Sequence, residues 1–134
     1  MTELKAVKTA SPVRGAAVVA AAAVAAEVVF LAVHQAGGVD LAVRSGSTVT
    51  HVGAGPVAVV SLLVSLAAWG LLALLQRVST RGRRIWTVVA TVVFVISLLG
   101  PLGGETAGAT LGLAALHLTV AAVVIAGLRW ASAR

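Results

Sequence analysis

Residues 56–76 read PVAVVSLLVSLAAWGLLALLQ, an apolar run without a charged side chain. An α-helix rises about 1.5 Å per residue, so about 20 apolar residues cross a hydrocarbon core about 30 Å thick. The run lacks the alternation of polar and apolar residues that marks a barrel strand, and it is longer than such a strand needs. It therefore predicts a transmembrane helix.

Three further runs have the same character, and glycines and prolines such as Gly37, Gly38, Gly55, Gly100 and Pro101 separate them. Such residues mark turns and helix ends. We therefore expect an all-α fold, a four-helix transmembrane bundle that forms a single domain over residues 1–134. The helices are predicted at residues 13–36, 56–76, 85–102 and 107–128.

The composition excludes several other classes of protein. Hydrophobic residues make up 60% of the chain and charged residues 10%, whereas soluble domains carry roughly 25% charged residues. The mean hydropathy of +1.07 also excludes a disordered chain. There is no cysteine, which excludes a disulfide scaffold and a cysteine-based zinc site.

The basic residues predict an orientation. Nine of the ten lysines and arginines fall on one side of the predicted bundle, and only Arg44 falls on the other. Basic loops stay in the cytoplasm, so both termini are expected there and no nucleic-acid partner is expected. Trp86 and Trp130 are expected at the inner headgroup level. The basic residues on that side are Lys5, Lys8, Arg14, Arg77, Arg81, Arg83, Arg84, Arg129 and Arg134.

Two features of these basic segments have a second interpretation. The run from Arg77 to Arg84 fits a topology signal in contact with anionic lipid, and the alternative is recognition of a partner protein. The first apolar run follows a basic start, as a signal peptide does. It is longer than a signal core and contains Glu27, so we expect it to stay as a membrane span.

Two ionisable side chains fall inside the predicted helices. Glu27 lies 13 residues after Arg14, about 20 Å along its helix, and His117 lies 12 residues before Arg129, about 18 Å along. Ionisable groups at the bilayer centre are costly and usually pair with one another inside the bundle. We therefore expect Glu27 and His117 to meet, directly or through water. The same counting places three serines at this depth: Ser61, Ser65 and Ser97.

Other polar residues gather towards the opposite side from the basic loops. His34 follows Glu27 by seven residues and therefore lies on nearly the same helical face. With Gln35 and His51 it is expected to line a mouth above Glu27, with Asp40 and Glu105 on the rim. The other half of the bundle is almost entirely apolar, so we expect a cavity that is closed on the basic side.

Glu27 and His117 are the candidate catalytic pair, because a carboxyl and an imidazole can exchange a proton near neutral pH. A structural clasp between helices is the alternative. His34, Ser61, Ser65, Ser97 and Trp69 are candidate binding residues, although Trp69 also fits core packing and the serines fit hydrogen bonds to their own helices. Glu27 and His34 are about 10 Å apart along the helix, too far to share an ion, so no metal and no cofactor is expected.

The basic start that leads into an alanine-rich helix, residues 97–102 (SLLGPL), residues 116–118 (LHL) and residues 127–129 (GLR) carry a resemblance. The chain resembles an uncharacterised family of small four-helix membrane proteins common in actinomycetes. The resemblance implies four spans and the bacterial plasma membrane. It carries over no activity and no catalytic residue, and Glu27 is not part of the pattern.

These observations favour a membrane-embedded pocket that binds a small lipophilic molecule and acts on it by proton transfer between Glu27 and His117. The first alternative is an oligomeric proton- or ion-conducting pore. The spacing of Gly108 and Gly112 permits close helix approach and keeps a homo-oligomer open. The second alternative is an accessory membrane subunit without catalysis.

Overall fold

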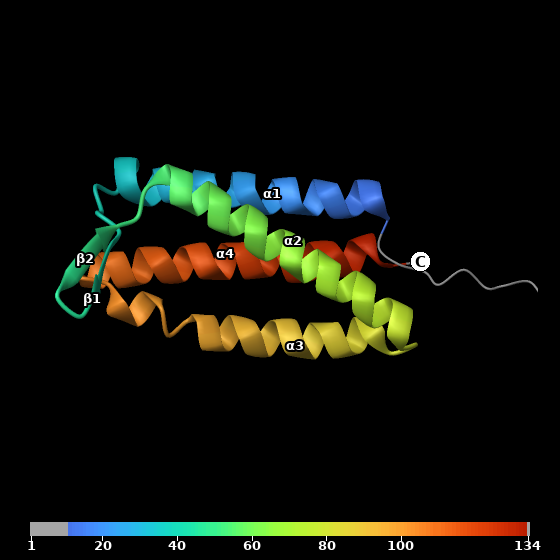
Figure 1. The fold of residues 1–134 in the computed structure, drawn as a ribbon. Helices are drawn as coiled ribbons and strands as arrows, with labels where there is room; N and C mark the ends of the chain where they lie inside the picture. The colour runs from blue at the N-terminus through green and yellow to red at the C-terminus, as the bar shows by residue number, and fades with distance from the viewer. Residues whose placement is uncertain (1–10, 134) are drawn as a thin grey trace, which may run out of the picture.

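The computed structural model describes residues 11–133, and its main feature is four long helices (Figure 1). Together with the short turns that follow α1 and α3, each helix is long and apolar enough to span a membrane, so the predicted fold class is confirmed. A π-helical turn, Ala32–Ala36, continues α1, and a 3-10 turn, Pro101–Gly103, follows α3. The helices are α1 (Pro12–Leu31), α2 (Ala54–Val78), α3 (Gly82–Ser97) and α4 (Ala107–Ala131).

The helix α4 lies between α1 and α3, and α2 crosses obliquely from the α1 side to the α3 side (Figure 1). Glycines allow α4 to approach α1. A Cβ atom at Gly127 would lie 2.8 Å from Cγ1 of Val18, and one at Gly112 would lie 2.9 Å from Cγ1 of Val33. The two helices are therefore antiparallel and in close contact along most of their length, as small residues permit in lipid.

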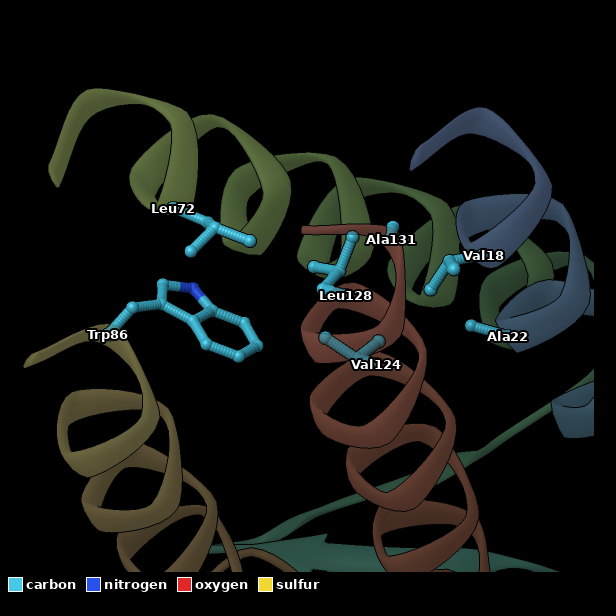
Figure 2. Packing of buried hydrophobic residues seen from close by; sticks show 7 residues of the cluster. All are labelled: Val18, Ala22, Leu72, Trp86, Val124, Leu128 and Ala131. Atoms are coloured by element: carbon cyan, nitrogen blue, oxygen red, sulfur yellow. The ribbon is translucent and has the colours of Figure 1, made fainter. Parts of the chain in front are cut away.

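Two clusters of buried side chains form the core. The first joins all four helices around Trp86, Leu72 and Leu128, which Figure 2 shows meeting between α2, α3 and α4. The second joins α1, α2 and α4 with Leu41 from the loop after α1. In α3 only Gly82 and Trp86 are buried. The bundle therefore holds α3 firmly at its start and leaves most of its length at the surface.

The two tryptophans that flank the basic residues differ in their surroundings. Trp130 is 54% exposed, and the Arg14 guanidinium lies 4.9 Å from the centre of its ring. Trp86 is fully buried, so its ring faces the interior of the bundle, and its expected level in the membrane stays a prediction. The cause of this burial is Gly82, where a Cβ would collide with the Leu75 carbonyl. This close approach brings the first turn of α3 against α2 and carries Trp86 inside.

The loop after α1 contains a β-hairpin that was not predicted. Strands β1 (Ala42–Ser45) and β2 (Thr48–His51) pair antiparallel, and Ser45 faces Thr48 across the turn. The first turn residue, Gly46, has φ +63°, which suits the tight turn that matches the twist of paired strands. Val43 bridges to Gly104, so the hairpin also closes over the turn between α3 and α4.

Both ends of the described chain lie at one end of the bundle (Figure 1). The Ser11 amide donates to the Ala131 carbonyl over 3.3 Å. We call this the arginine end, because Arg14, the α2–α3 turn and Arg129 are there, and we call the other end the hairpin end. Of the basic residues that predicted the orientation, Lys5, Lys8 and Arg134 lie outside the described residues.

Candidate functional site

Glu27 in α1 and His117 in α4 lie at almost the same level of the bundle. Val18 rests against Gly127 and Val33 rests against Gly112, so fifteen residues of one helix run alongside fifteen of the other. Glu27 is nine residues beyond Val18, which brings it level with Leu118, the neighbour of His117. The antiparallel packing therefore gives the carboxyl and the imidazole one depth.

The structure does not bring Glu27 and His117 into direct contact. Within residues 11–133 the ion pairs are Arg44 with Glu105 and His51 with Asp40. Nine residues of α-helix turn through about 180°, so Glu27 leaves α1 opposite to Val18, which faces α4. The carboxyl and the imidazole form no hydrogen bond or ion pair with each other among residues 11–133, so a bridge between them requires a third group.

The His117 ring is fixed by its own helix. Its Nδ1 lies 2.7 Å from the Leu113 carbonyl oxygen, one turn earlier. A carbonyl oxygen only accepts hydrogen bonds, so Nδ1 carries the proton in this arrangement. Nε2 is then the nitrogen left to accept, and no side chain of the described part of the chain bonds to it.

The Glu27 carboxyl has an unused hydrogen-bonding atom. The side chain is half-buried, and Oε1 is buried without a hydrogen-bond partner among residues 11–133. A buried polar atom that loses water and gains no partner costs about 1–3 kcal/mol. Glu27 is therefore a polar acceptor at membrane depth for which the described chain provides no donor.

Of the three serines, two lie in the interior of the bundle. Ser61 and Ser65 are buried in α2, and the Ser65 hydroxyl has no partner among the described residues. Trp69 of α2 packs on Gly15 of α1, and counting from that contact puts Ser61 about four residues, or about 6 Å, from the level of Glu27. Of these two buried serines, Ser61 is thus the nearer in depth to Glu27.

Ser97 and Trp69 are occupied by contacts within the fold. The Ser97 hydroxyl donates to the Phe94 carbonyl over 2.6 Å in the last turn of α3. The Trp69 indole fills the space above Gly15, where a Cβ would collide with it, and it packs against the first buried cluster. Ser97 therefore bonds within its own helix, and Trp69 packs between α1 and α2.

The expected mouth residues gather at the hairpin end. His34 places Nδ1 2.9 Å from the Val39 carbonyl oxygen, and its ring stacks on Phe30 with centroids 5.2 Å apart. His51 and Asp40 are exposed and joined over 2.7 Å. Gln35 lies in the π-helical turn and is also exposed. These contacts hold the loop after α1 in place over the bundle.

Two hollows lie away from Glu27 and His117. The basic hollow, of about 570 Å³, is lined by Thr80, Arg81, Arg83, Arg84 and Arg129 at the arginine end. The apolar groove, of about 430 Å³, runs between Phe94 of α3 and the side of α4 from Leu118 to Arg129. No group of three histidine, aspartate or glutamate side chains in residues 11–133 is placed to hold a metal ion.

Sequence reasoning placed the arginines near one another and missed the contacts that fix them. Arg129 donates from Nη1 to the Thr87 hydroxyl over 2.6 Å, and Arg83 donates from Nη2 to the Arg129 carbonyl over 3.1 Å. Arg83 and Thr87 are four residues apart and therefore share a face of α3. The spacing of four residues between Arg83 and Thr87 is the sequence signal that both side chains face the same neighbouring helix, which is α4.

Comparisons with known proteins give one result. A family model described as a family of unknown function (DUF6069) matches residues 7–134, which is nearly the whole chain. No curated protein and no solved structure matches the chain.

Proposed function

The chain belongs to the family of unknown function DUF6069, and we propose that it binds a small lipophilic molecule within the membrane, with the Glu27 carboxyl as the polar anchor. The observation that carries this proposal is the buried Oε1 atom without a partner among the described residues. A ligand with a hydroxyl or amine group supplies the missing donor and removes the cost of the unsatisfied oxygen.

The surroundings of Glu27 support a ligand that is mainly apolar. Its neighbours in the sequence, Ala26 and Val28, are apolar, and Ala26 belongs to a buried cluster with Phe30 and Val57. Ser61 and Ser65 add two hydroxyls on α2. Binding sites for small molecules usually combine apolar walls with a few placed polar groups, and this region has that composition.

His117 is the proposed second proton-exchanging group. Its Nδ1 is committed to Leu113, so Nε2 is the nitrogen that takes or gives a proton. Because Glu27 and His117 do not bond to each other among the described residues, the proton passes between them only through the bound molecule or through water. His34, at the hairpin end, is proposed to shape the approach to this site, whereas Ser97 and Trp69 are held by contacts within the fold and are not part of the proposal.

The pore alternative gains no support from the small residues. Gly108 and Gly112, whose spacing permits an intermolecular contact, are covered within the chain by Val39, Val33 and Leu41. An accessory subunit without catalysis would have no ligand at Glu27, and this absence distinguishes it from our proposal.

The setting we propose is the bacterial plasma membrane, with both termini in the cytoplasm. The support is the gathering of Arg14, Arg81, Arg83, Arg84 and Arg129 at one end of the bundle, because basic residues are retained on the cytoplasmic side. The hairpin then faces the outside.

The test compares protein in lipid nanodiscs by native mass spectrometry, which reports bound small molecules. The wild type and Glu105→Gln, a control at an exposed carboxyl, are expected to carry the same adduct. Glu27→Leu is expected to lose it, and His117→Ala is expected to keep it. An adduct that survives in Glu27→Leu at the wild-type level contradicts the proposal.

A further inference from the structure

The basic hollow at the arginine end contains four guanidinium groups and no carboxylate. Arg81, Arg83, Arg84 and Arg129 line it together with Thr80. Of the three carboxylates among residues 11–133, Asp40 and Glu105 belong to the hairpin end, where they pair with His51 and Arg44, and Glu27 is 13 residues beyond Arg14 along α1. The hollow is therefore a concentration of positive charge that the described chain does not balance.

Two of these arginines are held in place from within the fold. Arg83 donates from Nη2 to the Arg129 carbonyl, and Arg129 donates from Nη1 to the Thr87 hydroxyl. The Arg83 Nε atom is buried and has no partner among the described residues. A buried guanidinium donor without an acceptor is costly, so an anionic group that enters the hollow gains a fixed donor.

The start of α3 adds to the attraction for an anion. The helix begins at Gly82 beside the hollow, and no side chain caps its first turn. Free backbone N–H groups and the positive end of the helix dipole favour a negative charge at this position. The helix start and the arginines therefore act on the same ligand.

The apolar groove meets the basic hollow at Arg129, which lines both. Arg83, Thr87 and Phe94 are four and seven residues apart and lie on one face of α3. The boundary between α3 and α4 thus carries four arginines at one end and an apolar trough beyond them. A basic hollow that continues into an apolar groove matches an amphiphile with an anionic head group and a hydrocarbon tail.

We infer that the boundary between α3 and α4 is a binding site for an anionic phospholipid. The phosphate lies in the basic hollow, bound by Arg83, Arg84 and Arg81, and one acyl chain lies along the apolar groove against Phe94 and α4. The site is separate from Glu27 and does not depend on the function proposed above.

The test measures lipid retention in nanodiscs that contain phosphatidylglycerol in phosphatidylcholine, with native mass spectrometry as the readout. The wild type is expected to retain phosphatidylglycerol over phosphatidylcholine. Arg83→Gln is expected to weaken this preference by about tenfold or more, because it removes charge-assisted hydrogen bonds. Arg84→Gln, which breaks no contact within the fold, is expected to weaken it in the same direction.

Two control variants separate a built site from general attraction. Arg77→Gln removes an arginine of the same end that does not line the hollow, and its effect is expected to be about fivefold at most, the attraction of one surface arginine for an anionic membrane. Arg44→Gln at the hairpin end is expected to have no effect. An equal loss in Arg77→Gln and both hollow variants overturns the inference.

A further arm distinguishes a lipid from a free phosphate. Ala122→Phe narrows the apolar groove and replaces no arginine, and it is expected to reduce phosphatidylglycerol retention as strongly as Arg83→Gln does. Inorganic phosphate at millimolar concentration is expected not to displace the lipid. Full retention in Ala122→Phe, or displacement by inorganic phosphate, shows a phosphate site without a place for the acyl chain and overturns the inference.

Discussion

The Trp86 indole N–H donates to the main-chain carbonyl of Ala68 over 2.9 Å and joins α3 to α2 inside the bundle. Trp86 is also the largest fully buried side chain of the first cluster (Figure 2). Since α3 buries only Gly82 and Trp86, Trp86 is the one large side chain that α3 contributes to the core.

Trp86→Phe is therefore expected to lower the stability of the bundle by about 1–2 kcal/mol, through the lost hydrogen bond and the smaller ring. Trp86→Ala is expected to cost about 3–5 kcal/mol, because it leaves a cavity. Thermal unfolding in detergent, followed by circular dichroism, measures both. A melting temperature in Trp86→Ala equal to that of the wild type contradicts this role.

Gly127→Ala tests the contact between α1 and α4. The added methyl group would lie 2.8 and 2.9 Å from the two γ-carbons of Val18, so the helices must move apart, at a cost of about 1–3 kcal/mol. Gly70→Ala is the matched control in α2, where nothing lies within 4 Å of the added carbon. The same unfolding assay is expected to show a loss for Gly127→Ala and none for Gly70→Ala.

The orientation is open to a clean test because the chain contains no cysteine. Ser47→Cys in the hairpin turn is expected to react with a membrane-impermeant maleimide added to intact cells. Thr80→Cys in the α2–α3 turn is expected to react only after the cells are opened. If Thr80→Cys is labelled in intact cells and Ser47→Cys is not, the result contradicts the proposed orientation.

Gly46→Val tests the hairpin turn. Gly46 has φ +63°, a conformation that costs a β-branched residue roughly 1–2 kcal/mol. Hydrogen exchange is expected to become faster in β1 and β2 and to stay unchanged in the four helices, because the core does not depend on the turn. Ser47→Ala is the control, and an equal effect of both substitutions refutes the importance of the glycine.

The number and extent of the helices could be predicted because length and hydropathy decide them. The largest differences from the predicted ranges are at the ends of α1 and α3, which stop at Leu31 and Ser97, five residues early. A π-helical turn then continues α1, and a 3-10 turn follows α3. The hairpin was not predicted, because the glycines between the first two helices also fit a plain helix-breaking loop. Residues 42–51 read AVRSGSTVTH, in which Val43 and Val49 have polar residues beside them and a Gly-Ser pair lies in between. Two short β-prone segments separated by such a pair are the sequence signal for a hairpin.

The depth of the candidate site could be predicted, whereas its contacts could not. Rise per residue is constant in a helix, so Glu27 and His117 were placed at one level by counting. The direction in which each side chain leaves its helix depends on how the helix is rotated against its neighbours. In α1, alanine and valine occupy every side, so no apolar face in the sequence fixes that rotation.

The central claim is that the Glu27 carboxyl accepts a hydrogen bond from a bound lipophilic molecule. Infrared difference spectroscopy of protein before and after removal of bound small molecules by detergent exchange measures it most directly, with Glu27→Gln used to assign the carboxyl band. We predict that the Glu27 band shifts when the molecule is removed and returns when the extract is added back. A Glu27 band that is identical in all three samples would contradict the claim.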